Sequence, residues 1–163
     1  AAVVIAILGK QIAKAIFKKH VFNPAMIGIF LSIFIFKTSD GWWGAANLIA
    51  VAILGLFLLY KFRRLHLAIT FLLTYFIILF LLGFLLGNID NFANNLFNST
   101  IYFFAFFMLV EPKTSPISFK GRIIYGVISG MVISLGFIFL PAYALTAGLL
   151  ICNLFVPVIN YFT

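Results

Sequence analysis

The chain has 163 residues, of which 65% are hydrophobic and only 9% are charged. This composition excludes a soluble globular domain and is typical of a membrane protein that crosses the bilayer several times. The net charge of +8 could suggest a nucleic-acid partner, but the basic residues lie in short clusters between apolar runs, so membrane topology explains them better.

Seven membrane segments, all helical, are predicted in chain order. They cover residues 1–17, 24–36, 43–60, 66–86, 100–110, 121–140 and 142–162. We expect residues 1–163 to form a single transmembrane domain, in which 1–60 contribute to a first bundle and 61–163 form a second. Because Ala1 begins inside an apolar run, we also expect the chain to be part of a longer protein. A polar loop at 87–91 is expected after the fourth segment.

The second segment is too short to cross a bilayer alone. Asn23 predicts a helix N-cap and Pro24 suits the first helical position, while the thirteen residues 24–36 reach only about 20 Å. Broken backbone at membrane depth is tolerated only where it is buried in protein or lines a cavity, so the break points to a functional site. Its free N–H groups favour an anionic or electron-rich ligand, with a plain helix start as the alternative.

The fifth segment is also short and runs into a second polar break, Glu111-Pro112-Lys113-Thr114-Ser115-Pro116. A carboxylate and an ammonium in the membrane interior are energetically costly unless they are paired, hydrated or part of a functional site. Glu111 and Lys113 are therefore candidate functional residues. Thr114 and Ser115 add hydroxyl groups beside them. These groups would suit a polar ring or a cation; the alternative is a structural ion pair of Glu111 with Lys113 or Lys10.

Three titratable residues are candidates for an ion or charge pathway: Lys10, His20 and Glu111. No second histidine stands at ligand spacing from His20, so no metal site is predicted. The sequence shows no paired carboxylates, nucleophile–base set or phosphate-binding glycine loop, so no catalytic residue is predicted. In the sixth segment, Gly126-xxx-Gly130 predicts close helix packing within the chain rather than a dimer contact.

The basic residues sort to one side of the membrane if each short helix and its break make one crossing. One side then carries seven of them and the other carries only Lys37. The rich side is predicted to be cytoplasmic, in a multi-pass protein of the cell inner membrane. Its loops hold Lys18 and Lys19, the run Lys61–Arg64, and Lys120 with Arg122. The two half-helices have opposite order, which would suit a pseudo-symmetric, transporter-like core.

Several motifs occur in an order that resembles a known family. They are His20–Gly28, Phe106–Met108 leading into Glu111–Pro116, Lys120–Gly126, and Leu149–Asn153 followed by Pro157. Together they cover most of residues 8–160. They resemble the large flavin-carrying membrane subunits of two assemblies, the sodium-pumping NADH:quinone oxidoreductase and the Rnf electron-transport complex.

The resemblance implies an all-α fold with two inverted bundles, akin to urea and ammonium transporters. It also implies electron transport coupled to Na⁺ or H⁺, other subunits of a membrane complex as partners, and a flavin cofactor. Family members attach FMN to a threonine in a Ser/Asp-x-Ala-Thr-like motif, whereas this sequence contains no Ala-Thr dipeptide and has Glu111 where the family has aspartate. The expected flavin, FMN or riboflavin, is therefore non-covalent.

Three hypotheses follow; in the third, the chain is a scaffold subunit whose breaks are vestigial and which acts only within a larger complex. The first is a membrane electron-transport subunit, within an oxidoreductase or translocase complex, that holds a flavin near the two breaks. Its predicted cofactor-binding residues are Phe22, Asn23, Pro24, Glu111, Lys113, Thr114 and Ser115. The alternative is a non-redox channel or transporter of the same architecture, which passes a small solute or an ion between the half-helices.

Overall fold

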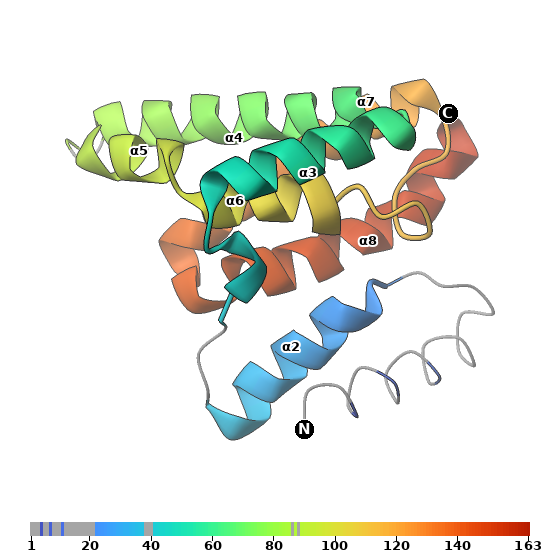
Figure 1. Cartoon of the computed structure of the whole chain (residues 1–163), viewed down its shortest axis with the longest axis horizontal. Helices are drawn as coiled ribbons and strands as arrows, with labels where there is room; N and C mark the ends of the chain where they lie inside the picture. Colours follow the sequence, from blue (N-terminus) through green and yellow to red (C-terminus); the bar gives the residue numbers. More distant parts are fainter. Residues whose placement is uncertain are drawn as a thin grey trace.

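A computed structural model describes residues 4, 7, 11, 22–37, 41–85, 87 and 89–163 of the chain. These residues form helices and no strand, which confirms the all-α membrane class (Figure 1). The helices are α2 (Pro24–Phe36), α3 (Leu48–Lys61), α4 (Leu65–Leu85), α5 (Ile89–Leu96), α6 (Ser99–Phe103), α7 (Phe119–Phe139) and α8 (Ala144–Phe162). The described residues also form two 3₁₀ turns, η1 (Trp43–Ala45) and η3 (Pro141–Tyr143), and a π-helical turn, η2 (Phe104–Met108). The inverted-bundle arrangement stays a prediction.

Within the part of the chain that the structure describes, three helical stretches are long and apolar enough to cross a membrane: Leu65–Leu85, Phe119–Phe139 and Pro141–Phe162. Three shorter apolar stretches accompany them: Pro24–Phe36, Leu48–Lys61 and Ser99–Met108. The short second and fifth segments are thereby confirmed as half-length helices. Large apolar side chains such as Phe57, Leu73 and Phe84 are exposed, as expected for a surface that faces lipid.

The prediction of one continuous helix over 43–60 is wrong at its start. A 3₁₀ turn occupies Trp43–Ala45, and the helix begins only at Leu48. The physical reason is Asn47, whose side-chain oxygen accepts hydrogen bonds from the N–H groups of Ile49 (3.0 Å) and Ala50 (3.1 Å) and so caps a separate helix. The remaining 14 residues of α3 reach about 21 Å, less than a bilayer core.

The polar loop expected after the fourth segment is largely helical instead. Residues Ile89–Leu96 form α5, which lies beside α4 in Figure 1. Phe92 explains this packing, because its ring meets those of Phe76 and Phe80 edge-on at centroid distances of 6.3 and 5.5 Å. The polar residues that suggested a loop belong to an amphipathic helix whose aromatic side contacts α4.

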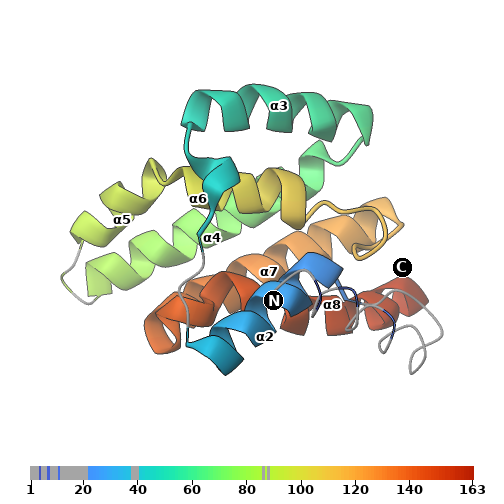
Figure 2. The same ribbon diagram turned by 60° about the horizontal axis from the view of Figure 1, so that its bottom comes forward.

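The core forms where α7 packs between α4 and α8. A Cβ atom added at Gly126 would lie 2.1 Å from Thr70 Oγ1 of α4, and one at Gly130 would lie 2.7 Å from Thr74 Cβ. These two glycines therefore let the α4 and α7 backbones approach closely, which confirms the predicted packing role within the chain. The half-helix α2 lies alongside α8 (Figure 2).

Candidate functional site

The structure brings the two polar breaks together at Asn153, a fully buried residue of α8. In the amide orientation that matches donors to acceptors, its nitrogen donates to the Thr114 carbonyl (3.1 Å) and to the Tyr125 hydroxyl (2.9 Å). Its oxygen accepts from the backbone N–H of Asn23 (3.1 Å). The Asn153 side chain thus supplies hydrogen-bond partners for backbone groups of both breaks, which are buried away from water.

Asn23 makes the first break with its own side chain. Its oxygen accepts hydrogen bonds from the N–H groups of Ala25 (3.0 Å) and Met26 (3.2 Å), and Pro24 follows at the first helical position. This is the predicted N-cap. Because Asn23 also donates its backbone N–H to Asn153, the start of α2 is fixed against α8.

Two arginines organise the second break, the loop 111–118. Arg64, from the turn between α3 and α4, is only 6% exposed and donates to the hydroxyl of Ser115, which in turn donates to the Glu111 carbonyl (2.7 Å). Burial and, second, the positive charge of Arg122 lower the pKa of the Arg64 guanidinium to about 10. Arg64 therefore remains a buried cation at neutral pH.

Arg122, in the first turn of α7, holds the end of the same loop. Its Nε donates to the Pro116 carbonyl (3.2 Å), its Nη2 to the Ile117 carbonyl (2.7 Å) and its Nη1 to the Arg63 carbonyl (3.1 Å). From α8, Asn160 accepts from the Ile117 N–H (3.0 Å). Side chains from the α3–α4 turn, α7 and α8 thus fix a loop that has no regular structure of its own.

The predicted site residues separate into two groups. Asn23, Thr114 and Ser115 are buried and bonded within the protein, whereas Glu111 is half-buried and Lys113 is exposed. A Glu111 carboxylate oxygen accepts from the Thr114 hydroxyl at 3.3 Å. Within the described loop, Glu111 forms no ion pair with Lys113.

The structure says less about the remaining predicted site residues. Phe22 and Pro24 are half-buried at the start of α2. Lys10 and His20 lie outside the described residues, and with them the Lys10–Glu111 pair and most of the proposed charge pathway. Among the residues that the structure describes, no three His, Cys, Asp or Glu side chains gather as a metal site.

A small cavity of about 120 Å³ lies on the side of the loop where Glu111 is accessible. It is lined by Leu58, Phe62, Phe106, Phe107, Val110, Glu111 and Pro112. The π-helical turn contributes two of these rings, and Leu109 N–H donates across it to the Phe104 carbonyl (3.0 Å). Ligand pockets usually measure about 300 to 1,000 Å³, so this cavity is smaller than a pocket for a whole cofactor.

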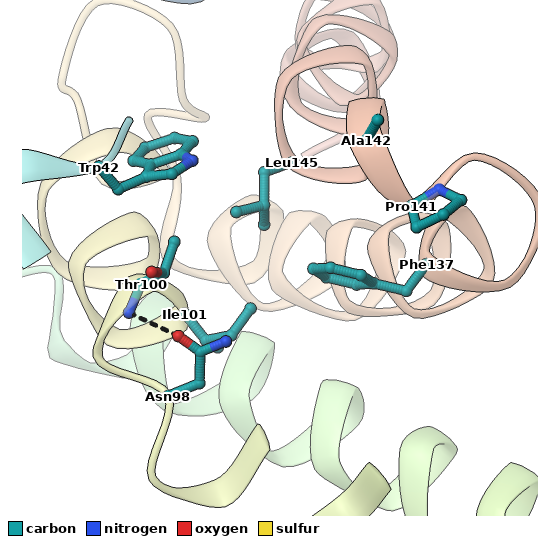
Figure 3. A pocket seen from close by; sticks show the side chains of 8 residues that line it. All are labelled: Trp42, Asn98, Thr100, Ile101, Phe137, Pro141, Ala142 and Leu145. Atoms are coloured by element: carbon teal, nitrogen blue, oxygen red, sulfur yellow. Dashed lines mark hydrogen bonds between the residues drawn. The ribbon is translucent and has the colours of Figure 1, made fainter. Parts of the chain in front are cut away.

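A second cavity, of about 150 Å³, lies at the opposite end of α7 (Figure 3). It is lined by Trp42, Asn98, Thr100, Ile101, Phe137, Pro141, Ala142 and Leu145. Asn98 caps α6 here, accepting from the Thr100 N–H at 3.0 Å. This cavity is also smaller than a cofactor pocket.

Sequence reasoning missed four residues of the site: Asn153, Tyr125, Arg64 and Arg122. An asparagine inside an apolar helix is itself a signal, because a buried amide needs partners. The two arginines were interpreted as charges that set topology, and Arg122 also as part of a family-like motif, but neither was predicted to bond to the loop of the second break, as both do.

The family model described as the NQR2, RnfD, RnfE family matches residues 32–163. The matched part contains the 111–118 loop and Asn153, while Asn23 precedes it. No curated protein shows significant similarity to the chain.

Proposed function

Because the chain belongs to the NQR2, RnfD, RnfE family, we propose that it contributes part of a flavin site to a membrane electron-transport complex. The family comprises membrane subunits of flavin-containing electron-transport complexes, and this chain is a multi-pass member. The finer assignment, a non-covalent flavin beside the 111–118 loop, rests on one observation. Glu111 lines an aromatic cavity and Lys113, two residues further along the chain, is exposed, while Thr114 and Ser115 of the same loop are buried and bonded within the protein.

The chain's own residues would act on a flavin at its edge. Phe106 and Phe107 would contact the ring system, and the Lys113 ammonium would stabilise the anionic reduced form. The bound flavin would supply one- and two-electron transfer. Since the cavity encloses only part of the ring, the remainder must be covered by another subunit or by residues outside the described part.

Coupling to Na⁺ or H⁺ is a further part of this proposal. Glu111 is the one described member of the predicted charge pathway, and a half-buried carboxylate can accept a proton or bind a cation. We also propose that the chain lies in the cell inner membrane, with the loop Lys61–Arg64 and the start of α7 on the cytoplasmic side.

The test is made on the complex purified in detergent. Its visible spectrum should show a flavin, and acid precipitation should leave that flavin in the supernatant. Lys113→Gln should lower the flavin potential, whereas Lys120→Gln, which removes another exposed charge at the start of α7, should not. A complex without flavin, or equal potentials in a flavin-loaded Lys113→Gln complex and the wild type, would contradict the proposal.

A second function, a non-redox channel or transporter, is favoured by the size of the two cavities. At about 120 and 150 Å³, either is better matched to a small solute or an ion than to a flavin. Solute flux into liposomes that contain the protein but no electron donor would support this alternative. Absence of flux in liposomes, together with a bound flavin, would exclude it.

A further inference from the structure

Positive charge gathers where the α3–α4 turn meets the start of α7. Arg63 and Arg64 come from the turn, Lys120 and Arg122 come from α7, and the Arg122–Arg63 hydrogen bond of 3.1 Å joins the two elements. Arg63 has a φ of +53°, a backbone conformation that residues other than glycine rarely adopt. The turn is closed by a bond from the Arg64 N–H to the Leu59 carbonyl (2.9 Å), which directs the Arg64 side chain inward to Ser115.

Among the side chains that the structure describes, no carboxylate is bonded to this cluster. Arg64 donates to a hydroxyl, and Arg122 donates to three backbone carbonyls, so the partners of both guanidinium groups are neutral. The chain contains only three acidic residues. Of the two in described elements, Asp90 belongs to α5, beyond the opposite end of α4, and Glu111 accepts from Thr114. A buried cation without an anionic partner is costly, so an external anion would stabilise this end of the molecule.

Exposed apolar side chains surround the cluster. They include Tyr60, Phe62, Leu65, Ile117 and Phe119. The ring of His66 lies 4.5 Å from that of Phe119, and the His66 Nε2 atom is buried without a hydrogen-bond partner. Cations next to exposed aromatic and aliphatic groups match the boundary between lipid headgroups and acyl chains.

We propose that Arg63, Arg64, His66 and Arg122 form a binding site for the phosphate of an anionic phospholipid. Guanidinium groups pair with phosphate oxygens through charge-assisted hydrogen bonds, and basic pockets between transmembrane helices suit phospholipid headgroups. The acyl chains would lie along Phe62 and Phe119. The general excess of cytoplasmic charge accounts for exposed Lys61 and Lys120, but not for an arginine that is 6% exposed. The lipid site shares Arg64 and Arg122 with the 111–118 loop, but lipid retention can be measured whether or not a flavin is bound.

The site is tested on the protein as purified from membranes with its accompanying subunits. The sample is exchanged into micelles that contain dioleoylphosphatidylglycerol or dioleoylphosphatidylcholine, and bound lipid is measured by native mass spectrometry. We expect the wild type to retain phosphatidylglycerol in at least tenfold excess over phosphatidylcholine. Millimolar inorganic phosphate should not displace it. Equal retention of both lipids, or displacement by free phosphate, would overturn the proposal.

Matched variants locate the site. Arg64→Gln should abolish the preference, Arg64→Lys should keep most of it, and Lys37→Gln, which removes a charge after α2, should leave it unchanged. If Arg64→Gln does not fold, Arg63→Gln at the exposed turn position should still weaken the preference severalfold. An equal loss in the Lys37 variant, or no loss in the Arg63 variant, would contradict the assignment.

Discussion

The two breaks in this chain are built in different ways. The first is local: Asn23 caps α2 by bonding to N–H groups two and three residues ahead. The second depends on distant residues, because the 111–118 loop is held by Arg64 and by Asn160, 51 and 43 residues away from their partners. Asn153 serves both breaks. A local break can therefore form with its helix, whereas the second requires α4, α7 and α8 to be in place.

Loss of Asn153 would remove hydrogen bonds from both breaks at once. Asn153→Ala should lower the free energy of unfolding by about 3 kcal/mol, because the Thr114 carbonyl and the Asn23 N–H are left buried without partners. Unfolding in detergent by a chemical denaturant measures this. Asn160→Ala, at an exposed position of the same helix, should cost about 1 kcal/mol or less. Equal costs in the two variants would contradict the role of Asn153.

Arg122→Gln would affect the second break alone. Losing three hydrogen bonds to carbonyls should cost about 2 kcal/mol and make the 111–118 loop sensitive to proteolysis, while α2 keeps its cap. Limited proteolysis with mass spectrometry gives the cleavage sites. Lys120→Gln, two residues earlier and exposed, should stay within about 0.5 kcal/mol of the wild type. New cleavage sites confined to the start of α2 would speak against this assignment.

Asn23→Ala would affect the first break alone, and it should cost less stability than Asn153→Ala or Arg122→Gln. Loss of an N-cap should cost about 1 kcal/mol, and Asn23→Asp should retain most of that stability because a carboxylate can accept the same two bonds. The measurement is again denaturant unfolding in detergent. A larger cost for Asn23→Ala than for Asn153→Ala would reverse the proposed order of the two residues.

The smallest expected effect has the opposite sign. Lys37 ends α2 with a φ of +50°, which glycine adopts without strain. Lys37→Gly should therefore raise the free energy of unfolding by about 0.5 kcal/mol, while Lys37→Gln leaves it unchanged. The shift of the denaturation midpoint relative to the glutamine variant gives the value. A lower midpoint in the glycine variant would show that the lysine side chain itself stabilises this helix end.

The sequence predicted features that a short motif signals by itself, such as a capping residue or a pair of small residues four apart. Asn23 and Pro24 start a half-helix as expected, and Gly126 and Gly130 pack against α4. It failed where distant packing decides the structure. The helix α5 depends on contact between Phe92 and α4, which no local pattern of polar residues reveals.

The positions of the two backbone breaks were predictable from the sequence, but the contacts that their residues make were not. Burial of Thr114 and Ser115, and exposure of Lys113, depend on where Arg64 and Asn153 reach the loop. Those partners lie in other helices, so their positions follow from tertiary packing and not from spacing along the chain. Whether Glu111 and Lys113 contact a flavin stays a prediction.

Amide hydrogen exchange at Asn23 most directly tests whether Asn153 joins the two breaks. With asparagine labelled by ¹⁵N, the Asn23 N–H can be followed in detergent before and after the Asn153→Leu substitution. We expect slow exchange in the wild type, because this N–H is bonded to the Asn153 oxygen, and at least tenfold faster exchange in a folded variant. Fast exchange in the wild type, or equal rates in both proteins, would show that the two breaks are not joined.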